Sequence, residues 1–180
     1  MTKLTVVNEY EAKKGKCAQG QQVAALNIRK ELKVAFPGIK FSVRRKDDTI
    51  NIEWQDGPTR AQVEKIAGKY ERGSFNIMSD IYENNYAEFN EKHGDTKYLF
   101  MNRTHSPNSL KIAGQMIAKK YAVSVPKVVI TQFGARYDAT KECVGSGWEY
   151  HWQIDVVAYR VLAKLAFAPN GELIENNMDI

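Results

Sequence analysis

The sequence predicts an α+β fold in which small antiparallel sheets carry amphipathic helices packed on one face. The first observation is a helical spacing of apolar residues between positions 18 and 36. The second is the alternation of apolar and polar residues in "KFSVRR" and "TINIEWQ", which is typical of strands with one dry and one wet face. The third is the order helix, strand, strand, helix, which forms a compact α+β unit.

The first predicted helix covers residues 18–36. Its apolar side is formed by residues three or four positions apart, namely Ala25, Ile28, Leu32 and Phe36. Its cations fall on the other side, namely Arg29, Lys30 and Lys33. Pro37-Gly38 ends the helix, because proline disfavours the helical conformation of the preceding residue and glycine allows a sharp exit.

Residues 40–55 predict a β-hairpin with its turn at Lys46-Asp47-Asp48. One face of the hairpin is apolar and collects Phe41, Val43, Ile50, Ile52 and Trp54. The opposite face is polar and collects Lys40, Ser42, Arg44, Asn51, Glu53 and Gln55. Arg45 shares the parity of the apolar face but lies at the hairpin end, where its long side chain can reach water.

A second helix is predicted after "DGPT", where Thr59 and Gln62 have the spacing of a capping box. Its apolar stripe consists of Val63, Ile66, Ala67 and Tyr70. Gly73 is placed to end this helix. The hairpin and its two helices then form a two-stranded sheet with helices on the dry face.

The segment "FNIMSDIYENNYAEFNEKHG" predicts a further helix, with Tyr82, Tyr86 and Phe89 at helical spacing and His93-Gly94 at its end. Three aromatic rings in a row can stack on nucleic-acid bases. Such a stripe is more often part of a hydrophobic core, and we favour that interpretation.

Strands and one more helix are predicted beyond residue 95. "KYLFMNRT" (97–104) has the composition of a strand, and Ser106-Pro107 is a favourable helix start. The buried stripe of that helix is Leu110, Ala113, Ile117 and Tyr121. "KVVITQFGARYD" (127–138) predicts a strand broken by Gly134.

"WEYHWQIDVVAYRV" (148–161), which follows a turn at "GSG", alternates and predicts a long strand. Pro169-Asn170-Gly171 predicts the turn of a final hairpin. We therefore expect one compact α+β protein over 1–180, with an internal seam near residue 95. Residues 15–94 form the helix-strand-strand-helix unit, and 95–180 form a strand-helix-strand extension.

The positive charge of the chain is concentrated near its start. Residues 1–46 hold eleven Lys or Arg and three acids, while the remainder holds fifteen basic and eighteen acidic residues. Clustered cations favour a polyanion, because neutralising phosphates releases counterions. The alternative is a cationic segment that serves solubility alone. The candidate residues for binding nucleic acid or a partner are Arg29, Lys30, Lys33, Lys40, Arg44, Arg45 and Lys46.

Several other classes of site find no support in the sequence. Cys17 and Cys143 are far apart and are expected to be free thiols, and no cysteine or histidine pair has metal-ligand spacing. No phosphate-binding loop or cofactor motif is present, so we expect no metal and no cofactor. No apolar run suits a membrane span and the start lacks signal-peptide features, so we expect a cytoplasmic protein that does not engage a membrane.

An enzyme is the less favoured hypothesis. The polar residues Glu149, His151, Gln153 and Asp155 alternate along the predicted strand, and a histidine among carboxylates can act as a base. Neighbours on one face of a strand are about 7 Å apart, however, so His151 and Asp155 cannot hydrogen-bond along it. Cys17 has no histidine partner that the sequence identifies. We therefore expect no catalytic residues.

Residues from about 15 to 83 resemble a known family. The matching features are the "IRKELK" helix, "FPGIKFSV", the "IEWQDGPT" strand and turn, and "YERGSF" followed by "DIYE". This combination is similar to the large polyvalent protein-associated domain, the twenty-ninth of that series. The resemblance implies a protein of phages or conjugative elements, of a kind thought to help incoming DNA survive in a bacterial host. It supplies no catalytic residues.

Two functions follow as expectations. The first is a non-enzymatic accessory protein of a phage or mobile element that binds nucleic acid, or a host complex that handles nucleic acid, in the bacterial cytoplasm and in the service of counter-defence. The second is an anti-defence inhibitor that contacts a host protein directly through an apolar and aromatic surface. The sequence does not indicate an oligomeric state.

Overall fold

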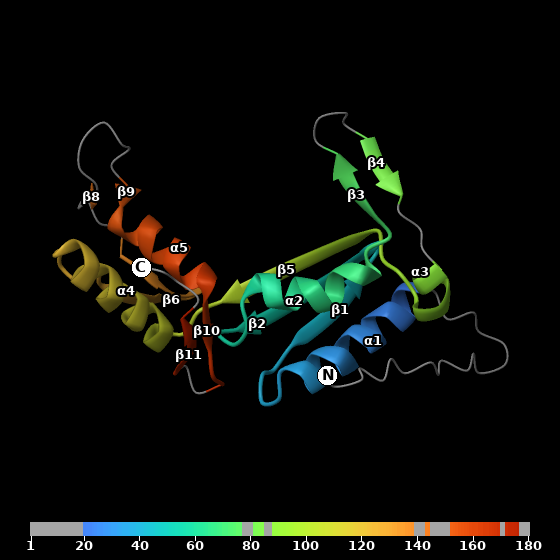
Figure 1. Ribbon diagram of the computed structural model, residues 1–180, viewed down its shortest axis with the longest axis horizontal. Coiled ribbons are helices and arrows are strands. Elements are labelled where there is room, and N and C mark those ends of the chain that lie inside the picture. The colour runs from blue at the N-terminus through green and yellow to red at the C-terminus, as the bar shows by residue number, and fades with distance from the viewer. Residues whose placement is uncertain are drawn as a thin grey trace. The chain divides into compact units, whose positions relative to one another are not determined.

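The computed structural model describes residues 20–76, 81–84, 88–138, 143–144, 152–169 and 172–176. The chain divides into two compact units, which Figure 1 shows with their elements labelled. Unit 1 contains residues 1–54 and 60–102, and unit 2 contains residues 55–59 and 103–180. The expectation that residues 1–180 form a single compact body stays a prediction.

Unit 1 carries the elements up to the strand that leads out of it. In chain order they are α1 (Gly20–Ala35), β1 (Ser42–Lys46), β2 (Thr49–Gln55), α2 (Arg60–Ala67), the 3-10 turn η1 (Gly68–Tyr70), β3 (Gly73–Asn76), β4 (Ile81–Asn84), α3 (Glu88–His93) and β5 (Tyr98–Thr104). The last residue of β2 and the last two residues of β5 are counted in unit 2. The predicted hairpin is confirmed.

Unit 2 carries the remaining elements together with the segment 55–59. In chain order they are α4 (Pro107–Tyr121), β6 (Val128–Thr131), β7 (Gly134–Tyr137), β8 (Cys143–Val144), β9 (Trp152–Gln153), α5 (Ile154–Lys164), β10 (Leu165–Phe167) and β11 (Leu173–Asn176). The final hairpin expected around Pro169 is confirmed, because β10 pairs with β11 in antiparallel orientation.

The main sheet of unit 1 has three strands in the order β1-β2-β5 (Figure 1). Strands β1 and β2 are antiparallel, with Val43 opposite Ile52 and Arg44 opposite Asn51. Strand β5 runs in the same direction as β2, since the Tyr98 N–H donates to the Asp48 carbonyl near the start of both strands. Near the end of both strands, the Asp56 N–H donates to the Thr104 carbonyl at 2.9 Å.

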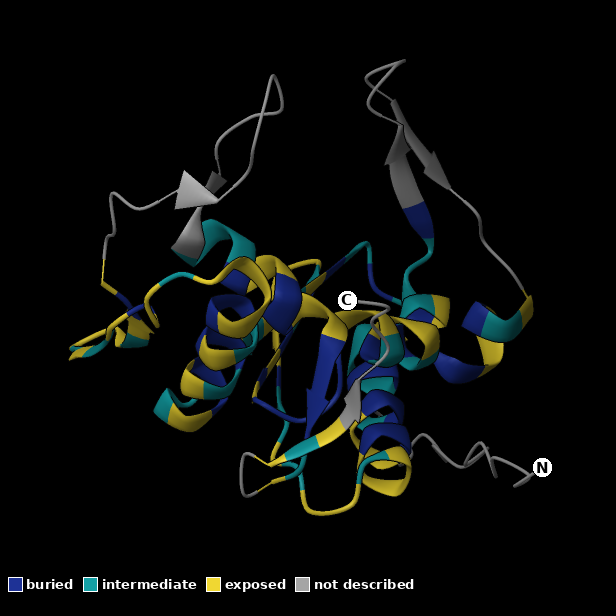
Figure 2. Cartoon of the chain, turned by 60° about the vertical axis from the view of Figure 1, so that its left-hand side comes forward, coloured by how far each residue is buried: buried dark blue, intermediate teal, exposed yellow. Residues whose placement is uncertain are grey.

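The hydrophobic core of unit 1 lies on one face of this sheet. The strands contribute buried side chains of one parity: Val43, Ile50, Ile52, Trp54 and Leu99. The helices α1 and α2 contribute Ala24, Ala25, Ile28, Leu32, Val63 and Ala67 to the same cluster. Both helices therefore cover the same face, as the sequence predicted, and Figure 2 shows helices with buried (dark blue) stretches beside exposed (yellow) ones.

Helix α1 also buries two polar residues that find partners inside unit 1. The Asn27 amide donates to the His93 carbonyl at 3.0 Å. The Tyr70 hydroxyl donates to Glu31 Oε1 at 2.7 Å, and Lys69 Nζ lies 2.6 Å from Glu31 Oε2. Burial, and then the hydrogen bond to Glu31, raise the pKa of Tyr70. These bonds fix the position of α1 because breaking one leaves a buried polar group unsatisfied.

Three sequence-based predictions about local structure are wrong. The expected helix around Tyr82 is replaced by the antiparallel hairpin β3–β4, and the helix α3 begins only at Glu88. The helix α2 ends at Ala67, so that Gly73 starts β3 instead of ending the helix. The strand expected at 127–138 is a hairpin, in which Gly134 starts β7 with a φ of 108°. Tyr86 lies outside the described residues.

The long strand expected at 148–161 is wrong from Ile154 onward, where α5 begins. The alternation of Ile154, Val156 and Ala158 favours a strand. Ala158, Val161 and Leu162 have the three- and four-residue spacing of a helix, and they are buried in the core of unit 2. Packing against that core selects the helix. The "GSG" turn lies outside the described residues.

The overall prediction of an α+β protein with small antiparallel sheets is confirmed. The helix starting at Ser106-Pro107 is confirmed in detail, since the Ser106 side chain caps α4 by accepting a hydrogen bond from the Ser109 N–H. Among the described residues, none of the helices combines the length and apolar character needed to cross a bilayer.

Gly94 stands at a close approach of two backbone segments in unit 1. Its φ is 78°, and a Cβ atom there would lie 2.1 Å from the Gly20 carbonyl oxygen and 2.7 Å from the Ala24 nitrogen. A side chain would therefore push α1 away from the segment that follows α3. Gly134 in unit 2 has a similarly positive φ, but nothing lies within 4 Å of a Cβ atom placed there.

Replacing Gly94 by Ala is expected to lower the free energy of unfolding by about 2–5 kcal/mol, from the strained φ and the clash together. The matched control Gly134→Ala adds only the strained φ and is expected to cost about 1 kcal/mol. Urea unfolding followed by circular dichroism measures both. Equal costs for the two variants would contradict the close approach at Gly94.

Candidate nucleic-acid interface

The outer face of the β1-β2-β5 sheet is the face that α1 and α2 leave uncovered. Its side chains have the opposite parity to the core residues, and they form rows across the strands. The register of β1 and β2 pairs Lys46 with Thr49, Arg44 with Asn51, and Ser42 with Glu53. The hydrogen bond from the Tyr98 N–H to the Asp48 carbonyl extends two of these rows, placing Tyr98 beside Thr49 and Phe100 beside Asn51.

Two of the predicted cations, Arg44 and Lys46, lie on this outer face. Both are exposed, and within the described residues their side chains make no hydrogen bond and no ion pair. The acidic side chains nearby are Glu53 on the same face, and Asp47 and Asp48 at the turn. Arg44 and Lys46 are therefore held by the sheet in fixed rows while their charges remain available to a ligand.

The other predicted cations occupy different surfaces. Lys30 and Lys33 lie on the exposed side of α1, and Lys40 is exposed just before β1. Arg45 is exposed at the end of β1, opposite Ile50 and so on the inner side of the sheet. Because α1 covers the inner face, Lys30, Lys33 and Arg45 do not form one continuous face with Arg44 and Lys46.

Arg29 has a structural contact that the sequence did not indicate. Its guanidinium donates a hydrogen bond to the carbonyl of Val43. Val43 lies on β1, an edge strand of the sheet, so this hydrogen bond ties α1 to the edge strand. Arg29 is therefore a structural residue of unit 1 as well as a candidate cation.

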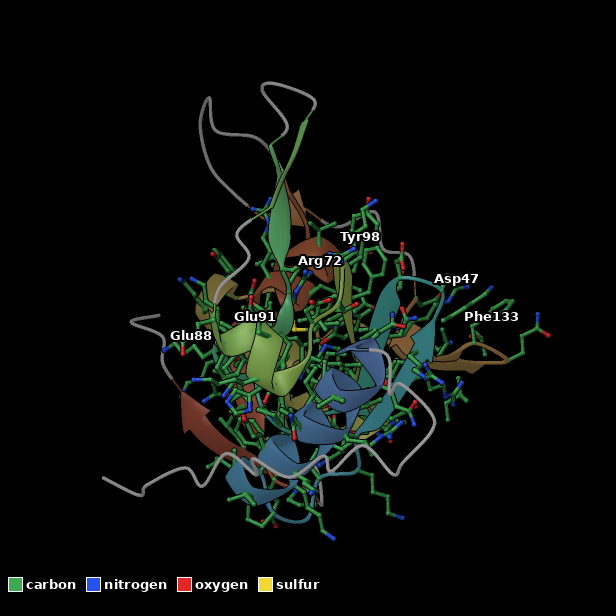
Figure 3. All side chains as sticks on the ribbon, turned by 90° about the vertical axis from the view of Figure 1, so that its right-hand side faces the viewer. Asp47, Arg72, Glu88, Glu91, Tyr98 and Phe133 are labelled. Atoms are coloured by element: carbon green, nitrogen blue, oxygen red, sulfur yellow. The ribbon has the colours of Figure 1, made fainter. Side chains whose placement is uncertain are left out.

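The outer face also carries two aromatic side chains that no sequence pattern had indicated. Phe100 is 59% exposed, and Tyr98 is half-buried with Lys97 Nζ 5.1 Å from its ring centroid. Figure 3 shows Tyr98 at the end of the sheet where the Asp47 turn lies. Of the alternative stripe, Tyr82 lies in β4 and Tyr86 lies outside the described residues, while the Phe89 ring packs against Tyr70 and His93.

Unit 2 contains a polar cluster whose residue types suggest a hydrolase triad. Asp56 is buried and accepts hydrogen bonds from the Ser106 N–H at 3.0 Å and from the Ser109 hydroxyl. His105 Nδ1 lies 4.0 Å from Asp56 Oδ1. The Ser109 hydroxyl therefore bonds the carboxylate and not the imidazole, which is the wrong order for nucleophilic activation. The cluster holds the start of α4 against residues 55–59.

Arg103 anchors the same region of unit 2. Its guanidinium donates to four backbone carbonyls at 2.8–3.1 Å, those of Asp56, Gly57, Leu162 and Leu165. It also lies 5.7 Å from the centroid of the Phe167 ring. Burial lowers the pKa of Arg103 to about 10, so the side chain keeps its charge at neutral pH. Because four of its five N–H donors bond backbone carbonyls of unit 2, Arg103 has a structural role.

The polar row considered as a catalytic alternative, which includes Gln153 and Asp155, does not continue along one strand. Asp155 lies in the first turn of α5, so it does not continue a strand face with the residues before it. Glu149 and His151 lie outside the described residues. In the described part of the chain, no three His, Cys, Asp or Glu side chains converge to hold a metal ion.

His105 is expected to make stability depend on pH. Burial first, and then the charge of Arg103, lower the pKa of His105 from 6.5 to about 4. The unfolded chain therefore binds a proton that the folded chain rejects, and stability falls as the pH drops from about 6.5 toward 4. The loss reaches about 3 kcal/mol, at 1.36 kcal/mol per pKa unit.

Urea unfolding at several pH values, compared between the wild type and His105→Gln, isolates this contribution. The difference between the two proteins should shrink or change sign as the pH falls, since only the wild type carries the imidazole. Parallel pH profiles would show that His105 is not held neutral by the fold.

A comparison with known families matches the part of the chain that contains the β1-β2-β5 sheet. Residues 19–106 match the family model described as large polyvalent protein associated domain 29. The match extends through β5, beyond residue 83 where the sequence resemblance ended. No curated protein and no solved structure matches the chain significantly. Residues 19–106, just under half of the chain, are therefore similar to the large polyvalent protein associated domain 29, a domain associated with proteins of phages and mobile elements.

Proposed function

We propose that this protein binds nucleic acid without catalysing a reaction, through phosphate contacts on the outer face of the β1-β2-β5 sheet. The observation that carries the proposal is the pair Arg44 and Lys46. Both are exposed on a sheet face that no helix of unit 1 covers, and within the described residues neither has an internal partner. Exposed cations in fixed rows suit the regularly spaced phosphates of a nucleic-acid strand.

The charge distribution supports the same ligand. The segment 1–46, which includes β1, has eight more basic than acidic residues, while the remainder has three more acidic than basic residues. A net charge of +5 for the whole chain favours association with polyanions. Phosphate contacts position a protein without reading sequence, so we expect binding without base specificity from these cations alone.

The family supports a setting for this activity. The domain is associated with proteins of phages and mobile elements, and the resemblance implies a setting in which incoming DNA must survive in a bacterial host. In our proposal, the protein acts there on nucleic acid, or on a host complex that handles it, as a counter-defence factor. Lys30 and Lys33 of α1 lie away from this face, so in our proposal they do not contact the same phosphates.

The double substitution Arg44→Ala/Lys46→Ala is expected to weaken binding to a labelled oligonucleotide by about tenfold or more at 0.1 M salt. The slope of log affinity against log salt should fall in magnitude by about two, one for each phosphate that the variant no longer neutralises. Fluorescence anisotropy at a series of salt concentrations measures both quantities.

The charge-matched control is Lys30→Ala/Lys33→Ala, which removes two cations from the exposed side of α1. It should reduce affinity less than the outer-face pair. The proposal would be refuted by wild-type protein that binds no oligonucleotide, or that binds with an affinity independent of salt. A larger effect from the α1 pair would move the interface to that helix.

A second candidate function is direct contact with a host protein. The observation that favours it is the β6–β7 hairpin of unit 2, where Phe133 is 90% and Ile130 is 78% exposed; Figure 3 labels Phe133 on this hairpin. The turn is ordered, since Thr131 Oγ1 accepts from the Phe133 N–H and donates to the Gly134 carbonyl. An aromatic side chain held out on a rigid turn is suited to a pocket in a partner.

Affinity purification from expressing cells, with and without nuclease, separates the two functions. A stoichiometric protein partner that survives nuclease and is absent with Phe133→Ala supports the inhibitor. Recovery of nucleic acid that Arg44→Ala/Lys46→Ala abolishes supports the first proposal.

A further inference from the structure

The outer face of the sheet pairs cations with aromatic rings, which duplex binding by phosphate contacts alone does not require. Phe100 is 59% exposed although its strand neighbours Leu99 and Met101 pack into the core. A single exposed apolar side chain needs no explanation. Here, however, Tyr98 lies two residues away on the same face, and each ring shares a row with one cation of β1: Lys46 with Tyr98, and Arg44 with Phe100.

We propose that this face is a stacking platform for unpaired bases, so that the protein binds single-stranded nucleic acid in preference to a duplex. This inference rests on the proposed function and names its ligand class. Phe100 supplies the main stacking ring, Tyr98 a second ring, and Arg44 and Lys46 contact the phosphates. Aromatic rings beside a cationic track are the recurring means of binding single strands without strong sequence preference.

The spacing of the two rings suits an extended strand. Same-face neighbours on a β-strand are about 7 Å apart, roughly twice the 3.4 Å rise per nucleotide of one strand in a duplex. Bases that remain stacked in a helix therefore cannot each meet one ring. Bases that have been drawn apart can, and only unpaired bases expose their faces to a sheet surface.

Polar side chains on the same face add a group that can hydrogen-bond a base, and acidic side chains limit where phosphates can lie. Asn51 lies in the row of Arg44 and Phe100, where its amide can hydrogen-bond the edge of a stacked base. Glu53 lies in the next row and repels phosphates. Asp47 and Asp48 do the same at the turn, so the phosphate track is confined to the two rows of Arg44 and Lys46.

The combination of positive charge and aromatic rings favours nucleic acid over protein as the ligand of the outer face. A protein partner would account for an exposed ring, but not for one cation in each aromatic row. Deoxyribose and ribose strands share the chemistry that the face recognises, since both present bases and phosphates. The experiment therefore uses both.

The test measures binding of the full-length protein to labelled oligo-dT, oligo-U and a DNA duplex of equal length at a series of salt concentrations. The variant Phe100→Leu keeps an apolar side chain but removes the ring, and Phe100→Trp keeps a ring. Phe133→Ala is the matched control, because it removes an exposed ring from another surface. Circular dichroism and thermal unfolding verify that each variant is folded.

The wild type should bind the single strands more tightly than the duplex. Phe100→Leu should weaken single-strand binding by about 5- to 100-fold, the range for losing one stacked base, with little change for the duplex and an unchanged salt slope. Phe100→Trp should retain single-strand binding, and Phe133→Ala should match the wild type. A stronger response to oligo-dT or to oligo-U identifies which of the two strands the face prefers, and either result supports the platform.

Some results would refute the stacking platform alone, and others would refute the proposed function with it. If both ligand types bind in a salt-dependent manner and Phe100→Leu binds like the wild type, stacking is wrong and the phosphate contacts stand. If no oligonucleotide binds, the proposed function fails together with the platform. An equal loss of affinity in Phe100→Leu and Phe133→Ala would also refute a specific role for Phe100.

Discussion

One-sided packing of the β1-β2-β5 sheet is the constraint on which the candidate interface depends. Helices α1 and α2 both bury their apolar stripes against the face that carries Val43, Ile50 and Ile52. A sheet can carry a core on each of its faces, but α1 and α2 both pack on the same one, and in the described part of unit 1 Arg44, Lys46 and Phe100 are exposed on the other. Because side chains alternate along a strand, every residue that adjoins a core residue on β1 and β5 points outward. Arg44 and Phe100 owe their positions to this alternation.

Buried polar contacts hold the covered face in place. Glu31 accepts a hydrogen bond from the Tyr70 hydroxyl and pairs with Lys69, and the Asn27 amide donates to the His93 carbonyl, so α1 is tied to η1 and to the end of α3. Arg29 adds a contact from the same helix to the carbonyl of Val43. A rigid sheet is useful to a ligand, because side chains held in register lose little entropy on binding. Unit 2 is held by different means, with Arg103 donating to four carbonyls.

Local patterns predicted the elements whose apolar residues follow either the two-residue period of a strand or the 3.6-residue period of a helix, but not both. The alternation around Val43 and Ile52 indicated the hairpin, and Pro37-Gly38 indicated the end of α1. Residues 154–161 were mistaken for part of a strand because their apolar residues include both an alternating set and a helical set, and packing in unit 2 decides between the two. Phe100 was missed because both parities of "KYLFMN" are rich in apolar residues, so no pattern indicates which one faces the core. The division of the predicted cations between surfaces depends on α1 packing, which no local pattern contains.

The central claim is that the outer face of this sheet is the surface that meets nucleic acid. The most direct measurement is an NMR titration of the isotopically labelled protein with unlabelled oligo-dT, following the ring signals of Phe100 and Tyr98 and the side-chain amide of Asn51. The account predicts upfield ring-current shifts for Phe100 together with movement of the Asn51 amide, while signals from the solvent side of α1 stay in place. Shifts confined to α1 or to unit 2, with the Phe100 ring signals unmoved, would contradict it.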